Sequence, residues 1–268
     1  MTFDVAAEAY DRFMGRYSRP LAPLLADLAG VGGGQRVLDV GCGPGALTAE
    51  LVARLGPRAV TAVDPSAPFV AAARGRYPGV DVREASAERL PFPDGRFDAA
   101  LAQLVVHFMS DPVAGLAEMA RVTRPDGVVA ACVWDHAGDQ GPLHVFWEAA
   151  RDLDPDVADE SRLAGARQGD LAELFGAAGL REIEESALAV TVEHSSFEAW
   201  WEPFTGGVGP AGSHVAGLDP ERRVTLRERC RSLLPVGPFA LSAIAWAARG
   251  VVRAPSLIAA SPIPDSGR

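Results

Sequence analysis

The sequence predicts an α/β protein with a doubly wound, mostly parallel sheet, and three observations support this. Short apolar runs typical of buried strands alternate with helical stretches over roughly a hundred residues. Three glycines follow the first strand and open the first helix, and an acidic residue ends the second strand. Such alternation builds βαβ units, whose helices cover both faces of a parallel sheet.

Five strands are expected before residue 135. Their ranges are 36–41, 59–64, 80–85, 97–106 and 127–134. Helical periodicity is found over 3–28 and between the strands, at 46–56, 67–77 and 111–123. Asp111 and Pro112 mark the start of the last of these helices, since Asp is a good N-cap and Pro suits the first turn.

The alternation becomes less regular after Trp134. Helices are expected at 142–153, 170–179, 196–204 and 219–234, and further strands at 180–194 and 239–252. We therefore predict one domain over 1–268. Its parts are an N-terminal helical cap (1–30), a ligand-binding core (31–135), helical insertions (136–168 and 195–235) and a flexible, Pro- and Ser-rich tail (254–268).

Composition excludes several classes of partner. The formal net charge is −10, Lys is absent and no basic stripe is found, so nucleic acid and anionic membranes are unlikely partners. No apolar run is long enough to span a bilayer and no signal-peptide layout is found, so a cytoplasmic protein is expected. Cys42, Cys132 and Cys230 lack metal-ligand spacing, so no metal site is predicted. The oligomeric state is left open.

The glycine-rich turn predicts a ligand bound against bare backbone. Gly41, Gly43 and Gly45 fit the dinucleotide pattern G-x-G-x-x-G/A, and a purely structural tight turn is the alternative. Asp64 ends the second strand 64 − 41 = 23 residues after Gly41, where an acid can bind ribose hydroxyls or cap the next helix. A ribose-bearing ligand is therefore expected, and both NAD and S-adenosyl-L-methionine (SAM) fit.

Four short sequence motifs, in this order, make part of the chain similar to a known family. With "VLDVGCGPG", "VDPS", "SAERLPFPDGRFD" and "RVTRPDG", the segment 36–135 resembles the class I SAM-dependent methyltransferases, in particular the small-molecule group that shares the methyltransferase type 11 core. The resemblance implies a Rossmann-like sheet of seven strands, with the last strand antiparallel and inserted beside the sixth, and helical lid insertions. It also implies methyl transfer from SAM to a small-molecule acceptor.

The resemblance also implies where SAM binds. Asp39 and the three loop glycines would lie against the methionine part, Asp64 would bind the ribose and Pro65 would face the adenine. Ser86 and Ala87 would lie at the adenine edge, although Ser86 departs from the Asp that is frequent in the family.

Three further residues are expected to complete the cofactor site. Gln103 would lie near the sulfonium and the amino group of SAM. Tyr10 and Arg16 belong to a segment resembling one that closes over SAM, and either could bind its carboxylate. The alternative for Tyr10 and Arg16 is an amphipathic helix, with the tyrosine packed inward and the arginine solvated.

His107 is the candidate general base for an oxygen or nitrogen acceptor, because it follows the fourth strand near the expected methyl position. His144 is a weaker candidate in the lid. The lid aromatics Phe146, Trp147, Trp200 and Trp201 could line an acceptor pocket or pack as a core. A nicotinamide-dependent oxidoreductase and a non-catalytic SAM- or nucleotide-binding protein are the alternatives, the first disfavoured because its usual Tyr/Lys pair needs a lysine.

Overall fold

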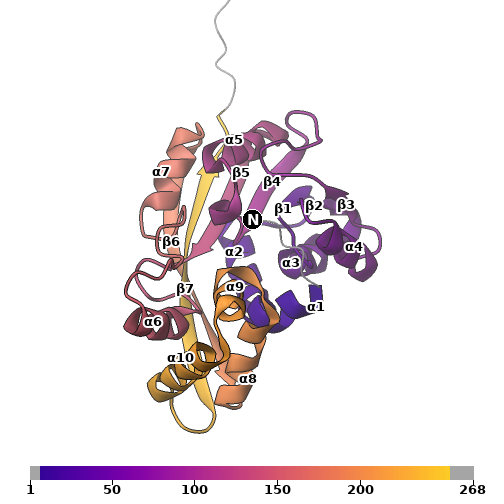
Figure 1. Cartoon of the computed structure of the whole chain (residues 1–268). Helices are drawn as coiled ribbons and strands as arrows, with labels where there is room; N and C mark the ends of the chain where they lie inside the picture. The colour runs from indigo at the N-terminus through magenta and orange to yellow at the C-terminus, as the bar shows by residue number, and fades with distance from the viewer. Residues whose placement is uncertain (1–6, 254–268) are drawn as a thin grey trace, which may run out of the picture.

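Seven strands form one sheet within residues 7–253, the part of the chain that the computed structural model describes (Figure 1). The strands are β1 (Val37–Val40), β2 (Val60–Asp64), β3 (Asp81–Glu84), β4 (Phe97–Gln103), β5 (Thr123–Trp134), β6 (Arg181–His194) and β7 (Phe239–Val251). Their order across the sheet is β3-β2-β1-β4-β5-β7-β6. The first five strands pair in parallel, and β7 lies antiparallel between β5 and β6.

This topology confirms the predicted fold class, including the antiparallel last strand. The antiparallel β7, inserted between β5 and β6, differs from the parallel strand order of a dinucleotide-binding sheet. The nicotinamide alternative therefore loses its structural support. The tail predicted at 254–268 lies outside the described residues.

The start of β5 differs from the prediction. The strand begins at Thr123 rather than at 127, because Thr123 already pairs with Phe97 before the register shifts to Val128 opposite Ala99. The turn expected around Asp126 is retained inside the strand, where Asp126 has a φ of +59°. Asp is one of the few residues that tolerate this left-handed conformation, so the irregularity is local.

Helices cover both faces of the sheet. One face carries α2 (Arg16–Leu28), α3 (Ala46–Leu55) and α4 (Ala67–Arg76), and the other carries α5 (Pro112–Val122) and α7 (Asp170–Ala177). Successive side chains of β1 alternate between the two cores, since Val37 joins the core under α2 and α3 and Leu38 joins the core under α5 and α7.

Four further helices gather in the lower half of Figure 1, around the lower part of β6 and β7, and form a lid. These are α6 (His144–Leu153), α8 (Phe197–Trp201), α9 (Gly209–Gly217) and α10 (Pro220–Leu233). The lid aromatics are buried against one another, and the rings of Phe146 and Phe204 stack with centroids 4.7 Å apart. Core packing, rather than the lining of an acceptor pocket, is therefore the role that the structure gives to Phe146, Trp147, Trp200 and Trp201.

The described part of the segment predicted as an N-terminal cap is helical. A short helix α1 (Ala7–Tyr10) and a π-helical turn (Asp11–Gly15) lead without a break into α2. The Asp11 carboxylate pairs with Arg76 at 2.6 Å, and Arg76 also donates to the Pro44 carbonyl at 3.1 Å. The π-helical turn is thereby tied to the glycine-rich loop.

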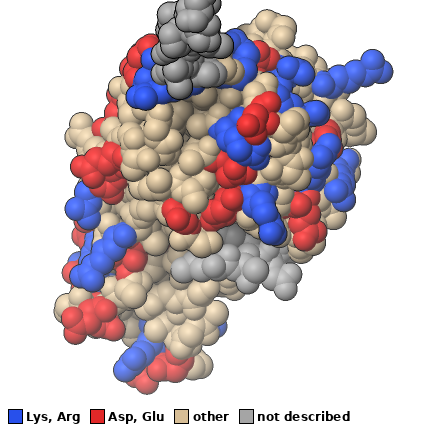
Figure 2. Space-filling model, turned by 90° about the horizontal axis from the view of Figure 1, so that it is seen from above, with Lys and Arg blue, Asp and Glu red and all other residues tan. Residues whose placement is uncertain are grey.

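Charges of both signs are interspersed over the face seen from above in Figure 2. Ion pairs such as Arg121 with Glu118 at 2.6 Å and Arg124 with Asp98 at 2.8 Å neutralise many of the arginines. That nucleic acid is not a partner stays a prediction. Within residues 7–253, no helix is both long and apolar enough to cross a bilayer.

Candidate functional site

A cavity of about 500 Å³ lies where β1, β2 and β4 end. Its volume falls in the usual range for small-ligand sites, and the carboxyl ends of parallel strands are where open α/β sheets bind ligands. The residues predicted from the sequence that line this cavity are Tyr10, Gly41, Gly43, Asp64, Pro65, Ser86, Ala87 and Gln103.

The three loop glycines have different reasons to be glycine. All have positive φ, but a Cβ on Gly41 would lie 2.4 Å from Val105, and a Cβ on Gly45 would lie 2.3 Å from the Tyr77 ring. A Cβ on Gly43 would meet nothing within 4 Å. Gly41 and Gly45 are therefore required by packing, whereas Gly43 faces open space in which a ligand can approach the backbone.

Asp64 joins the loop to the next strand. One carboxylate oxygen accepts a hydrogen bond from the Gly43 N–H and the other from the Ser66 N–H, both at 2.8 Å. Its side chain is buried, and burial raises its pKa. Each carboxylate oxygen has a second acceptor site, so Asp64 can still receive ribose hydroxyls.

Gln103 presents an unpaired acceptor to the same cavity. Its Nε2 donates to the Ser18 carbonyl of α2 at 2.9 Å, which leaves Oε1 buried without a hydrogen-bond partner in the described chain. Buried polar atoms are rarely left without a partner. Gln103 Oε1 is therefore suited to receive a donor from a ligand, and an ammonium would meet this requirement.

Sequence reasoning missed much of the apolar wall. Phe69 of α4 contacts Tyr10 edge to face at 5.4 Å, and Val105 and Met109 follow β4. Glu84 also lines the cavity. It could have been predicted from the sequence, because it is an acid at the end of β3 as Asp64 is at the end of β2. The apolar residues had no such signal, since only the fold shows which side chains of a loop face inward.

Arg16 and His144 are not brought to this cavity, and Gly45 does not line it either. Arg16 lies against the lid, where its guanidinium contacts His194 Nδ1 at 3.1 Å and donates to the Ala199 carbonyl at 3.2 Å. His144 begins α6, and its Nδ1 lies 2.9 Å from the Gly141 carbonyl. Of the two candidates for the SAM carboxylate, only Tyr10 lines the cavity.

Asp39 lies beneath the loop rather than on the cavity wall. It points from β1 toward α3, where the Thr48 hydroxyl donates to its carboxylate at 2.6 Å. Burial raises the pKa of Asp39 to about 7, since the side chain is only 1% exposed, and the nearby Asp64 adds to this effect. The Thr48 hydrogen bond acts in the opposite direction.

Comparison with known proteins places the chain in a family. Residues 38–131 match the family model described as "Methyltransferase domain". A Mycolicibacterium smegmatis protein named "Probable S-adenosylmethionine-dependent methyltransferase" is 30% identical over 178 residues, which cover 63% of this chain and 68% of that protein. This chain belongs to the SAM-dependent methyltransferases.

Two further comparisons concern the length of the matched segment and the fold. An uncharacterised Mycobacterium tuberculosis protein is 35% identical over 127 residues, which cover 46% of each chain. The match therefore spans about half the length of that curated relative. The crystal structure of YcgJ from Bacillus subtilis aligns with a TM-score of 0.58 at 21% identity, covering 88% of this chain and 99% of that one. This structural likeness supports the fold.

The residues present fit SAM, the cofactor of the family. Gly43 leaves the loop backbone open, Asp64 offers ribose acceptor sites, and Gln103 Oε1 needs a donor of the kind that the methionine ammonium supplies. Ser86 and Ala87 lie on the wall after β3, as the adenine assignment requires. These individual roles stay predictions, because cavity lining alone does not assign a contact.

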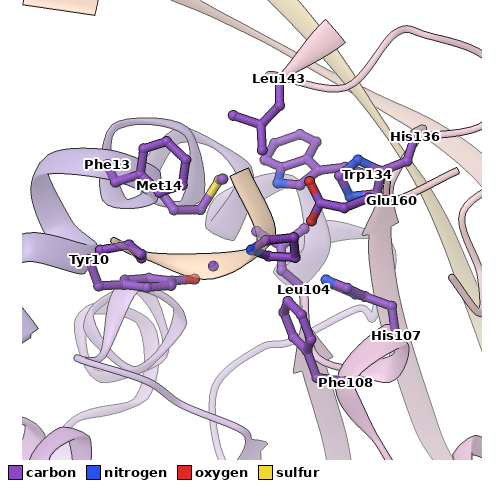
Figure 3. Close-up of a pocket in the computed structure, with 13 residues that line it drawn as sticks. Tyr10, Phe13, Met14, Leu104, His107, Phe108, Trp134, His136, Leu143 and Glu160 are labelled. Atoms are coloured by element: carbon purple, nitrogen blue, oxygen red, sulfur yellow. The ribbon is translucent and has the colours of Figure 1, made fainter. Parts of the chain in front are cut away.

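A second cavity of about 40 Å³ adjoins the first in this methyltransferase (Figure 3). Tyr10, Leu104 and Phe108 line both cavities. Leu104 has a φ of +60°, a conformation that is uncommon for a branched side chain and that is found most often where surrounding structure enforces it. The remaining walls come from the N-terminal turn, the end of β5 and the lid.

His107 lines this smaller cavity. It lies in a 3₁₀ turn (Val106–Phe108) just after β4, and its Nδ1 is buried without a hydrogen-bond partner in the part of the chain that the structure describes. Burial lowers the pKa of His107 well below its usual value, and the His136 ring, 6.0 Å away between centroids, lowers it further. His107 is therefore a neutral imidazole at physiological pH.

The loop glycines give a first test. Gly45→Ala should lower the free energy of unfolding by about 2–4 kcal/mol, because positive φ and the Tyr77 ring both oppose a Cβ. Gly43→Ala should cost only about 1 kcal/mol but should weaken SAM binding at least about tenfold, since the new methyl group projects into the cavity. Denaturant unfolding and calorimetric titration measure the two effects. Equal behaviour of the two variants would contradict the assignment.

Asp39 gives a pH test. Its carboxyl ionises near 3.8 when unfolded and near 7 when folded, so the folded state binds more protons between these values and stability is lost as pH rises through that window. Asp39→Asn should remove this loss, because its amide oxygen still accepts from Thr48. Its melting temperature should exceed that of the parent at pH 8 and not at pH 4. The exposed Asp156→Asn should show no such pH-dependent gain.

Proposed function

We propose that this chain transfers a methyl group from SAM to a small-molecule acceptor bound in the smaller cavity. The observation that carries the proposal is that the two cavities share Tyr10, Leu104 and Phe108 as walls. A donor in the larger cavity and an acceptor in the smaller one would face each other across this boundary. SAM supplies a methyl group on a sulfonium, which a nucleophile takes by in-line displacement.

The protein's main contribution is to position the acceptor and to exclude water. The smaller cavity is walled largely by apolar side chains, with Phe13 and Met14 from the N-terminal turn, Leu143 before α6 and Val208 before α9. Holding two reactants in line supplies a large part of the acceleration in such displacements. Because these walls come from segments far apart in the chain, the lid must be folded for the cavity to exist.

His107 is the proposed proton acceptor. A hydroxyl acceptor must lose its proton as its oxygen is methylated, and a protonated amine must lose one before its nitrogen can attack. His107 is a neutral base on the cavity wall. Its lowered pKa keeps it unprotonated but also makes it a weaker base than an ordinary histidine. We therefore expect its contribution to lie at the lower end of the usual range for general bases.

A named relative illustrates the range of acceptors. The malonyl-[acyl-carrier protein] O-methyltransferase of Pseudescherichia vulneris is 35% identical over 147 residues, which cover 55% of this chain and 57% of that protein. That match leaves a large part of both chains unaligned, and the acceptor walls here are contributed in part by the lid. The oxygen acceptor of that enzyme is therefore not carried over to this one.

The cofactor assignment is tested by titration. The parent should bind S-adenosyl-L-homocysteine with micromolar affinity and should show little affinity for NAD or NADP. Asp64→Ala should weaken this binding by about 2–3 kcal/mol, because charge-assisted hydrogen bonds to the ribose are lost. The exposed Asp156→Ala should bind as the parent does. An unchanged affinity in Asp64→Ala would show that the ribose lies elsewhere.

The base assignment is tested by turnover at saturating SAM and acceptor. His107→Ala should lower kcat about 100-fold while leaving S-adenosyl-L-homocysteine affinity nearly unchanged. His144→Ala is the matched control and should keep its turnover, because that ring lies outside both cavities. Since the pKa of His107 lies well below 6.5, kcat should show no inflection from this group between about pH 6.5 and 8. A loss under about threefold would mean that positioning alone drives the reaction.

A further inference from the structure

The smaller cavity contains a buried carboxylate that the transfer of a methyl group does not require. Glu160 lies in the connector between α6 and α7, and its side chain points into the cavity in Figure 3. Only 4% of Glu160 is exposed. One of its oxygens, Oε2, accepts a hydrogen bond from the Trp147 indole N–H at 2.8 Å. This single neutral donor does not balance the charge.

No cation of the described chain is paired with this carboxylate. Within residues 7–253, no arginine lies within 4.0 Å of the Glu160 oxygens, and the sequence contains no lysine. Arg151 of the same lid pairs instead with Asp139 at 2.6 Å and Asp159 at 2.7 Å. A buried charge without a counter-charge is costly, so the arrangement calls for a cation from outside the chain.

The two histidines of the cavity do not supply that charge. Burial lowers the pKa of His136 even though Glu160 acts in the opposite direction, and the pKa of His107 is lowered further still. Burial also raises the pKa of the Tyr10 hydroxyl to about 12, so Tyr10 is neutral. Among the lining residues that belong to the described part of the chain, Glu160 is therefore the only one with a formally charged side chain.

The remaining walls suit an organic cation. Tyr10, Phe13, Phe108 and Trp134 contribute aromatic rings, which attract cations through their faces, and Glu160 lies among them (Figure 3). Burial away from water strengthens both the ion pair and the cation–π attraction. Neutral polar ligands would use the unpaired His107 and Trp134 nitrogens but would leave the carboxylate unbalanced.

We propose that the acceptor of this methyltransferase is a small apolar amine, bound as its ammonium form against Glu160. The inference rests on the proposed function, because only methyl transfer would make the bound amine an acceptor. The preference for binding an amine can be measured separately. The free volume of about 40 Å³ restricts the class to molecules with few atoms. Glu160 is then a specificity-determining residue. An ammonium has no free lone pair, so one of its protons would first pass to His107. The amine nitrogen would then bond to the methyl carbon as the methyl–sulfur bond breaks and S-adenosyl-L-homocysteine leaves.

The experiment is equilibrium binding of matched probes in the presence of saturating S-adenosyl-L-homocysteine at pH 7. The probes are ethylamine and isobutylamine, each compared with the alcohol of the same skeleton. The parent should bind at least one amine at least tenfold more tightly than its alcohol. Glu160→Gln should lose this preference, because the amide still accepts from Trp147 but carries no charge. The exposed Glu148→Gln should keep the preference.

Two further measurements separate a binding role from a structural one. Without amine, Glu160→Gln should melt at or above the temperature of the parent, since an unbalanced buried charge has been removed. Glu160→Asp, which keeps the charge at a shorter reach, should retain part of the amine preference. If Glu160→Gln does not fold, the comparison of amine with alcohol in the parent and in Glu160→Asp still decides the question.

The outcomes also separate this inference from the proposed function. A parent that binds alcohol as tightly as amine, or that binds neither amine at millimolar concentration, overturns the inference. So does a Glu160→Gln variant that keeps the preference. If labelled methyl groups pass only to alcohols or carboxylic acids, the amine inference fails and the proposed function stands. If amines bind but no acceptor is methylated, the proposed function fails and the binding inference stands.

Discussion

The site depends on the hydrogen bond from the Gly43 backbone N–H to the Asp64 carboxylate. It joins the loop after β1 to the end of β2, two strands that are neighbours in the sheet, and so sets the shape of the cavity between them. It requires the loop backbone to turn through positive φ, which glycine permits. The packing of Gly41 on Val105 and of Gly45 on Tyr77 then holds that turn against β4 and α4.

Three buried carboxylates lie in or close to the two cavities, and each has a different set of hydrogen-bond donors. Asp64 is stabilised by two backbone N–H groups, whereas Asp39 has one threonine hydroxyl and its pKa rises to about 7. Glu160 has one indole N–H and no cation among the residues described. The three carboxylates thus differ in how many donors and counter-charges surround them. Asp64 can bind the loop and a ligand together, and Asp39 can hold a proton. Glu160 needs a charged ligand.

The lid and the N-terminal cap close the smaller cavity through contacts between distant segments. Tyr17 of α2 donates to or accepts from His194 at the end of β6 at 3.0 Å, and Arg16 contacts the same ring at 3.1 Å. Gln103 of β4 bonds to Ser18 of α2 at 2.9 Å. Arg16 therefore serves to attach the cap to the lid, which explains why a cationic residue in the expected position does not face the cofactor cavity.

The antiparallel last strand was implied by the resemblance. The sequence by itself determined the fold class and the glycine loop with Asp64. These are encoded locally, because apolar periodicity, glycine and an acid at a strand end are each visible within a few residues. Only the tertiary structure decided that, of the three loop glycines, Gly43 is the one that faces free space. It also decided that Arg16 turns away and that Glu160 enters the cavity with His107. Glu160 lies in an irregular connector 53 residues after His107 (160 − 107), so no local pattern could bring the two together. Their approach depends on how the lid packs on the sheet, and that is a property of the whole chain.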